Sequence, residues 1–449
     1  MAADKRGDTD TDKMGDTVAA DRDGDNDKRG DTVAADRRGD THDQSKIEGD
    51  QDDIDSDGTA GVADNRGADE IDVTALDVKG KHASKKIKRT HTEQALTISV
   101  RDALRTIGEA GKEVIMKELQ QMLTKGVWTP VLERNLTSQE QQGIIRSSMF
   151  VKEKYLANGE YDKLKARLVA GGNMQDKSLY DDLSAPTASA SGVFTVLAIA
   201  AKEERLTAVI DIGGAFLHAG MNTEIPVYMR LNATLTSMLV ELNKEYREFT
   251  DERGRVVVHL RKALYGCVES AALWYEHLAG TLRTLGYTAN VYDACVFNRT
   301  NTAGEECTIA LHVDDLYITS KTITMIDELE KGLREAYGEV KCERGEVLNY
   351  LGMVFDASVK GEARVTMKGL VGDILRLFNG TGVAKSPATD ELFTSREGAS
   401  QAVEKQRQDF HNWVAKLLYL AKRARPNVLT AVAYLATKVH KCDTDVWSS

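Results

Sequence analysis

The sequence predicts an α+β fold that follows a long, disordered N-terminal tail. Two observations lead to this prediction. The composition changes near residue 95, from a segment with few large apolar side chains to one with enough of them to form a core. Beyond that point, stretches with apolar residues at helical spacing alternate with short β-branched stretches. Several of these strands come in pairs joined by turn residues, so antiparallel sheets are expected.

The tail, residues 1–94, is expected to be an acidic, repetitive segment that ends in a basic linker. Residues 1–80 hold 24 acidic and 11 basic residues, which leaves 46 acidic and 48 basic residues in the rest of the chain. The net charge of −11 therefore belongs to the tail, and the near-neutral body neither requires nor excludes a nucleic-acid partner. The sequence GDTVAADR at 15–22 recurs at 30–37, as in low-complexity segments that cannot bury a core. The basic cluster KKIKR at 85–89 is either a nuclear-import or nucleic-acid contact or a solvated linker.

Composition also indicates a compartment. No apolar run approaches the roughly 20 residues that a membrane span needs. The first residues lack the apolar segment of a secretory signal, and the five cysteines show no Cys-x-x-Cys spacing. We therefore expect an intracellular protein without a membrane partner, in the cytoplasm, with the nucleus as the alternative that the basic cluster leaves open.

The first folded elements are a helix at 107–122 and a hairpin of strands at 146–155 and 164–170, joined by Asn158–Gly159. Lys163, Lys165 and Arg167 alternate along the returning strand, so they point to one face. Such a face is either solvated or holds an anion such as a triphosphate. The elements that follow are a helix at 189–204, strands at 207–212 and 256–260, a helix ending near 285, strands at 296–297 and 307–313, and helices at 323–337, 410–421 and 428–439.

Three acids occupy positions where carboxylates are unusual. Asp211 lies within the apolar strand at 207–212, and Asp314 and Asp315 lie between two apolar, β-branched runs. A partly buried carboxylate costs several kcal/mol unless a positive charge offsets it. Hard oxygen ligands suit Mg²⁺, and a pair of such ions can catalyse phosphoryl displacement. From these residues alone, an ordinary hairpin with an acidic turn stays an alternative.

From about 107 to 444 the sequence resembles the reverse transcriptase domain of Ty1/copia-type LTR retrotransposons. The segments that carry the resemblance occur in the family's order: KARLVA at 165–170, DIGGAFL at 211–217, LYG at 264–266, WY at 274–275, HVDD at 312–315, YLG at 350–352, LLYL at 417–420 and RP at 425–426. The resemblance implies a right-hand polymerase with an antiparallel palm sheet. Fingers and palm would occupy 95–355 and a thumb-like helical region 356–449, with the chain expected to stop before RNase H.

The resemblance also implies an activity, RNA-directed DNA polymerisation, and a set of site residues. Asp211, Asp314 and Asp315 would be the catalytic metal ligands for two Mg²⁺ ions, with Mn²⁺ as a substitute. Lys165 and Arg167 would contact the incoming triphosphate. The implied partners are an RNA or DNA template with its primer, and deoxynucleoside triphosphates; no oligomeric state is indicated.

Two further positions belong to the implied nucleotide site. Phe216 would lie beneath the sugar, where its ring excludes a ribose 2′-hydroxyl, and Glu269 takes the place of the family's usual glutamine. The family's usual tyrosine before Val-Asp-Asp is His312, which can titrate near neutral pH. The alternative is therefore a catalytically inactive retrotransposon relic retained as a nucleic-acid-binding protein.

Overall fold

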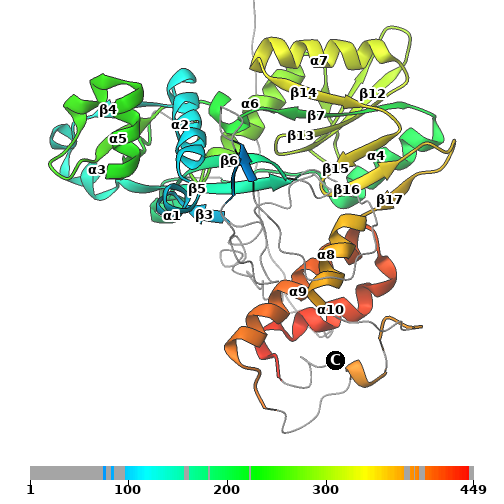
Figure 1. Cartoon of the computed structure of the whole chain (residues 1–449). Helices are drawn as coiled ribbons and strands as arrows, with labels where there is room; N and C mark the ends of the chain where they lie inside the picture. The colour runs from blue at the N-terminus through cyan, green and yellow to red at the C-terminus, as the bar shows by residue number, and fades with distance from the viewer. Residues whose placement is uncertain are drawn as a thin grey trace, which may run out of the picture. The chain divides into compact units, whose positions relative to one another are not determined.

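The computed structural model (Figure 1) describes residues 74–76, 82–84, 97–155, 161–180, 183–221, 224–378, 385–388, 390–393 and 400–443. Every described residue belongs to one unit, Ile54–Ser449. Most of the predicted tail and the predicted Asn158–Gly159 turn lie outside the described residues. Within the tail, β1 (Thr74–Leu76) and β2 (His82–Ser84) form an antiparallel pair.

A six-stranded sheet, here called the N-terminal sheet, has the order β3-β5-β8-β9-β4, with β6 paired to β5. Its strands are β3 (Thr97–Ser99), β4 (Trp128–Val131), β5 (Ile145–Tyr155), β6 (Tyr161–Ala170), β8 (Tyr228–Leu231) and β9 (Val256–Leu260). The predicted β5–β6 hairpin and the strand at 256–260 are confirmed. The pairing of β5 with β8 is parallel and joins Ile145 to Met229, far apart in the sequence.

Helices α1 (Val100–Thr106), α2 (Glu109–Thr124), α3 (Ser138–Gln142) and α5 (Ala233–Leu242) accompany the N-terminal sheet. The predicted helix at 107–122 is α2 with a later start, because Gly108 has φ of +71° and separates α2 from α1. Its buried face, which includes Ile115 and Leu119, joins the core that contains Leu168 and Met229. This packing fixes the position of β6, which carries the predicted cations.

The second large sheet, here called the central sheet, has the order β10-β11-β12-β13-β7-β14, and all its pairings are antiparallel. Its strands are β7 (Leu206–Ile212), β10 (Thr288–Ala289), β11 (Val296–Thr300), β12 (Glu306–His312), β13 (Asp315–Ser320) and β14 (Val340–Arg344). Helices α4 (Ala190–Lys202), α6 (Ser270–Thr284) and α7 (Ile323–Tyr337) contribute buried side chains to its core. The α+β class and the antiparallel sheet predicted from the sequence are confirmed.

The C-terminal part adds a three-stranded sheet and three helices. Strands β15 (Val347–Tyr350), β16 (Met353–Asp356) and β17 (Arg364–Thr366) are antiparallel, and helices α8 (Lys368–Phe378), α9 (Glu404–Arg423) and α10 (Leu429–Thr437) follow. The two predicted C-terminal helices are confirmed as α9 and α10. Tyr350 and Phe355 contact the ring of Tyr317 on β13, so β15 and β16 pack on the face of the central sheet that also carries Asp315.

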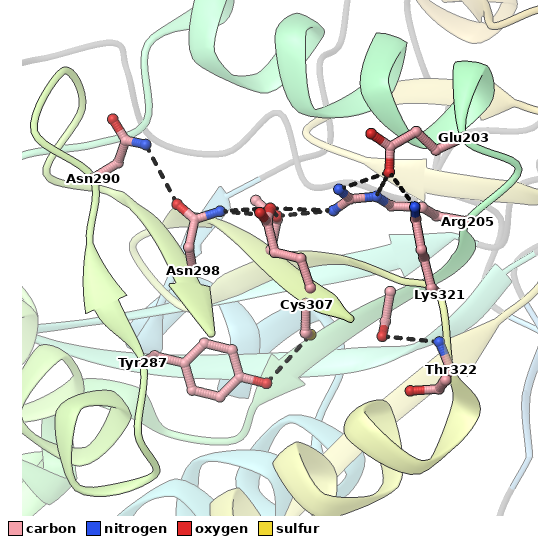
Figure 2. Close-up of polar contacts among 11 residues, drawn as sticks. Glu203, Arg205, Tyr287, Asn290, Asn298, Cys307, Lys321 and Thr322 are labelled. Carbon is pink, nitrogen blue, oxygen red and sulfur yellow. Dashed lines mark hydrogen bonds and ion pairs between the residues drawn. The ribbon is translucent and has the colours of Figure 1, made fainter. Parts of the chain in front are cut away.

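A polar network ties the start of β7 to β12 and β13, at the end of the central sheet away from Asp211 (Figure 2). The side chain of Arg205 is only 5% exposed and pairs with Glu203 at 3.0 Å and with Glu306 at 3.4 Å. Arg205 also donates to Thr308 Oγ1 at 3.1 Å, and Lys321 pairs with Glu203 at 3.2 Å. The network holds three neighbouring strands in one register, and that register sets which residues meet at the opposite end of the sheet.

Among the described residues, no helix combines the length and the apolar character that crossing a membrane requires.

Candidate active site

Register brings the predicted carboxylates together at one end of the central sheet. His312 of β12 lies opposite Asp315 of β13, and Asp315 lies opposite Asp211 of β7. Directly opposite residues share a face of the sheet, with Cα atoms about 4.5–5.5 Å apart. Asp314 occupies the turn that joins β12 to β13. Asp211, Asp314 and Asp315, here called the acidic cluster, thus lie at the same end of the central sheet, although a hundred residues of sequence separate Asp211 from the other two.

A cation lies in the same row and was missed from the sequence. Lys341 of β14 is the register partner of Asp211, on the side away from Asp315, and its side chain is exposed. The row across the sheet is therefore His312, Asp315, Asp211 and Lys341. No short motif marks Lys341, because only strand pairing places it next to the acids.

The turn that carries Asp314 is backbone-strained and tied to a helix. It has two residues, and Val313 has φ of +54°, a conformation that β-branched residues rarely adopt. The indole Nε1 of Trp274, a buried residue of α6, donates to the Val313 carbonyl at 2.7 Å. Strain of this kind persists only where surrounding contacts determine the geometry, and Trp274 supplies such a contact.

The surroundings of Asp314 perturb its carboxyl electrostatically. Burial, and then the negative charge of Asp211, raise the pKa of the Asp314 carboxyl to about 6, while Arg167 and Lys165 act in the opposite direction. The two carboxylates are therefore close enough to repel each other. Lys165 and Arg167 of β6 lie within electrostatic reach of the same carboxylate.

Phe216 and Arg167 are brought together by a third side chain, Tyr265. Phe216 lies in the short helix Ala215–His218, after Gly214 with φ of +62°. Its ring meets that of Tyr265 edge to face, with centroids 4.6 Å apart. The guanidinium carbon of Arg167 lies 4.4 Å from the centroid of the same ring. The sequence singled out Tyr265 only as part of LYG, without a role.

Glu269 is buried, with 4% exposure, just before the first turn of α6. Its Oε2 accepts from Gln175 Nε2 at 3.0 Å and its Oε1 from the Tyr180 hydroxyl at 3.2 Å. The backbone N–H of Val268 donates to Gln175 Oε1 at 3.0 Å, which completes the connection between the two segments. Burial, followed by the charge of Glu269, raises the pKa of Tyr180, which keeps the phenol a donor.

His312 is half-buried, and its Nδ1 has no hydrogen-bond partner in the part of the chain that the structure describes. Burial, and then the positive charge of Arg423 on α9, lower the pKa of His312. The Arg423 guanidinium stacks on Tyr419 at 3.6 Å, and the Tyr419 hydroxyl donates to the Leu351 carbonyl at 2.8 Å. Helix α9 is thereby attached to the turn between β15 and β16 of the three-stranded sheet, with Arg423 within electrostatic reach of His312.

The acids fit a hard divalent cation by donor type. Among the described residues, no group of three or more His, Cys, Asp or Glu side chains is placed so that it could hold a metal ion. Mg²⁺ usually binds through one or two carboxylates together with water and substrate phosphates, so a complete protein cage is not required. The mutual repulsion of Asp211 and Asp314 is the feature that a bound cation would relieve.

An acidic cluster on an antiparallel sheet, within electrostatic reach of Lys165 and Arg167 on β6 of the other sheet, defines a candidate nucleotidyl-transfer site. Residues 138–389, more than half of the chain, match the family described as reverse transcriptase (RNA-dependent DNA polymerase), and the chain belongs to this family.

Curated relatives specify the type of element. The chain is 23% identical over 297 residues to the retrovirus-related Pol polyprotein from transposon TNT 1-94 of Nicotiana tabacum, covering 64% of this chain and 21% of the relative. It is 25% identical over 303 residues to that of transposon RE2 and 26% over 293 residues to that of RE1, both of Arabidopsis thaliana. These matches cover 66% and 64% of this chain and 19% and 18% of the relatives, so the chain spans about a fifth of their length. The predicted resemblance to the Ty1/copia type is confirmed.

Proposed function

We propose that this chain is an RNA-directed DNA polymerase domain that adds deoxynucleotides to the 3′-hydroxyl of a primer. The observation that carries the proposal is the pairing of Asp211 with Asp315 across β7 and β13, next to the Asp314 turn, in a member of the reverse transcriptase family. An ordinary acidic hairpin would not require a third acid from a strand a hundred residues earlier.

In the proposed assignment, the central sheet is the palm and the N-terminal sheet belongs to the fingers. The fingers and palm span 95–355, and the helical region in 356–449 is the thumb. The basic residues of α9, among them Lys416 and Lys422, would follow the phosphates of a template–primer duplex.

The chain's own residues would perform three tasks in the reaction. Asp211, Asp314 and Asp315 would hold two Mg²⁺ ions, with Mn²⁺ as a substitute. When bound, such ions supply stabilisation of the attacking and leaving oxygens of an in-line displacement. Lys165 and Arg167 would bind the triphosphate through charge-assisted hydrogen bonds, which orients its α-phosphate. Phe216 would exclude a 2′-hydroxyl by steric contact.

The direct test is extension of a primed homopolymer RNA template with deoxynucleotides and either Mg²⁺ or Mn²⁺. Extension by the wild type and its loss in Asp314→Asn are expected. The matched control is Asp327→Asn, which changes an exposed aspartate of α7 and should leave extension intact. Wild-type activity that survives Asp314→Asn would refute the assignment of that carboxylate.

A second candidate function is nucleic-acid binding without catalysis, by an inactive relic. Glu269 and His312 favour it, since each replaces the residue usual in the family. A protein that binds primed RNA template but extends it with neither metal would support this candidate and refute polymerisation by this chain.

A further inference from the structure

Tyr265 lies between the two side chains proposed to select and hold the nucleotide. The Phe216 ring contacts the Tyr265 ring edge to face, with the two centroids 4.6 Å apart and the ring planes at 75°. The Arg167 guanidinium lies over the ring at 4.4 Å from its centroid. One aromatic ring thus contacts a residue on β6 and a residue that follows β7.

The backbone around Tyr265 is held tightly. Its carbonyl accepts from the N–H of Ala170, at the end of β6, at 2.7 Å. Gly266 has φ of +90°, and a Cβ there would come within 2.2 Å of the Ala170 carbonyl oxygen. A Cβ on Gly172 would approach the Gly266 carbonyl oxygen to 1.9 Å. The LYG segment and the end of β6 therefore cross at a contact that only glycines permit, and this crossing fixes where the Tyr265 ring is presented.

The electrostatic surroundings connect Tyr265 to the carboxylates as well. Burial, and next the negative charge of Asp314, raise the pKa of Tyr265, while Arg167 acts in the opposite direction. The ring is therefore a neutral phenol at physiological pH. A neutral ring can hold the Arg167 cation on its face through a cation–π contact.

We propose that Tyr265 is a positioning residue that holds Phe216 against the sugar and Arg167 toward the triphosphate, and that it thereby determines discrimination against ribonucleotides. The inference rests on the proposed polymerase function. Without the Tyr265 ring, Phe216 loses its edge-to-face neighbour and can turn away from the 2′ position, while Arg167 loses the surface that restricts its rotamers.

The test compares Tyr265→Leu and Tyr265→Phe with the wild type on adenine-homopolymer RNA primed with oligo-dT. Tyr265→Leu should raise the KM for dTTP about tenfold and raise the ratio of UTP to dTTP incorporation by a similar factor, with kcat within about twofold. Tyr265→Phe keeps the ring and should retain both values. Tyr292→Leu, which changes a tyrosine that is 97% exposed, is the matched control.

Binding of dTTP to the complex with a dideoxy-terminated primer provides a readout that does not require chemistry. Tyr265→Leu should weaken this binding about tenfold. A folded Tyr265→Leu protein with wild-type dTTP affinity and wild-type discrimination would overturn the role of Tyr265 alone. A wild type that binds neither primed template nor dTTP would overturn this role together with the proposed function. If thermal melting shows that Tyr265→Leu is not folded, Tyr265→His takes its place. Tyr265→His should bind dTTP more weakly than Tyr265→Phe and discriminate less against UTP. Equal dTTP affinity and equal discrimination in these two variants would overturn the role of Tyr265.

Discussion

Asp314→Asn is expected to stabilise the metal-free protein at neutral pH while abolishing the proposed reaction. The carboxyl of Asp314 has a pKa of about 6 in the folded chain, against an ordinary value of 3.8. Burial is the main cause, and the charge of Asp211 adds to it. The folded state therefore favours the protonated carboxyl, and ionisation above pH 6 acts against folding.

The size of the effect follows from the difference between the two pKa values. It is about two units, each equivalent to about 1.36 kcal/mol, so the ionised Asp314 lowers the free energy of unfolding by roughly 3 kcal/mol at pH 7. Because an acid with a raised pKa binds its proton more tightly when folded, stability should fall as pH rises from about 4 to about 6. Above pH 6 the loss should be constant. Asparagine has no such titration, so the gain from the substitution should grow over the same interval.

The assay is urea unfolding of both proteins between pH 4 and pH 8 in the presence of EDTA. The control is Asp356→Asn, because hydrogen bonds from Ser358 lower the pKa of that exposed carboxyl and its removal relieves nothing. Added Mg²⁺ should stabilise the wild type more than Asp314→Asn, since a cation offsets the repulsion from Asp211. A difference between wild type and Asp314→Asn that stays near zero at every pH would refute the raised pKa of Asp314.

Three further predictions concern the surroundings of the acidic turn. Trp274→Phe removes the donor to the Val313 carbonyl and should lower the free energy of unfolding by about 1–3 kcal/mol. The same substitution should reduce primer extension. Unchanged urea unfolding and unchanged extension would show that this hydrogen bond does not hold the turn. Glu269→Gln should leave the KM for dTTP unchanged, because the carboxylate is bonded to Gln175 and Tyr180; a several-fold fall in KM would show that this anion repels the triphosphate. Arg205→Leu should lower the free energy of unfolding in urea by about 1–3 kcal/mol, because Thr308 and Glu306 lose a buried donor while Glu203 keeps its pairing with Lys321, and an unchanged free energy would contradict this account.

Elements with strong local patterns were predicted closely. The helix at 323–337 and the strand at 256–260 have the bounds expected from apolar spacing. The strand β4 was missed because Pro130 was interpreted as the end of the preceding helix. Proline is tolerated in a strand at the edge of a sheet, and β4 is at the edge of the N-terminal sheet. Its edge position depends on pairing with β9, which local sequence does not encode.

The residues of the candidate site likewise fall into those that local sequence indicates and those that it does not. Asp211, Asp314 and Asp315 could be singled out from the sequence because charge within an apolar run is a local anomaly, whereas their role as metal ligands came from the family resemblance and stays a prediction. Lys341 and Tyr265 could not be, because each acquires its neighbours only through strand register or through the crossing of two glycine-containing segments. The indole–carbonyl bond of Trp274 is likewise invisible in a helical pattern that accounts for Trp274 as a core residue.

The position of His312 bears on whether the acidic cluster still functions. From sequence, a histidine beside two aspartates suggests a cation that could neutralise them near pH 7. In the structure, burial and the positive charge of Arg423 lower the pKa of His312, so the ring is neutral at physiological pH. Although His312 lies opposite Asp315, it adds no positive charge to the carboxylates. The substitution therefore leaves the acids available to a metal, and the stacking of Arg423 on Tyr419 keeps that cation beside the turn. The neutral state of His312 consequently depends on its burial and on whether α9 keeps Arg423 in place. Arg423→Leu should raise the pKa of His312, which NMR titration of its ring protons would measure, and an unchanged pKa would contradict this dependence.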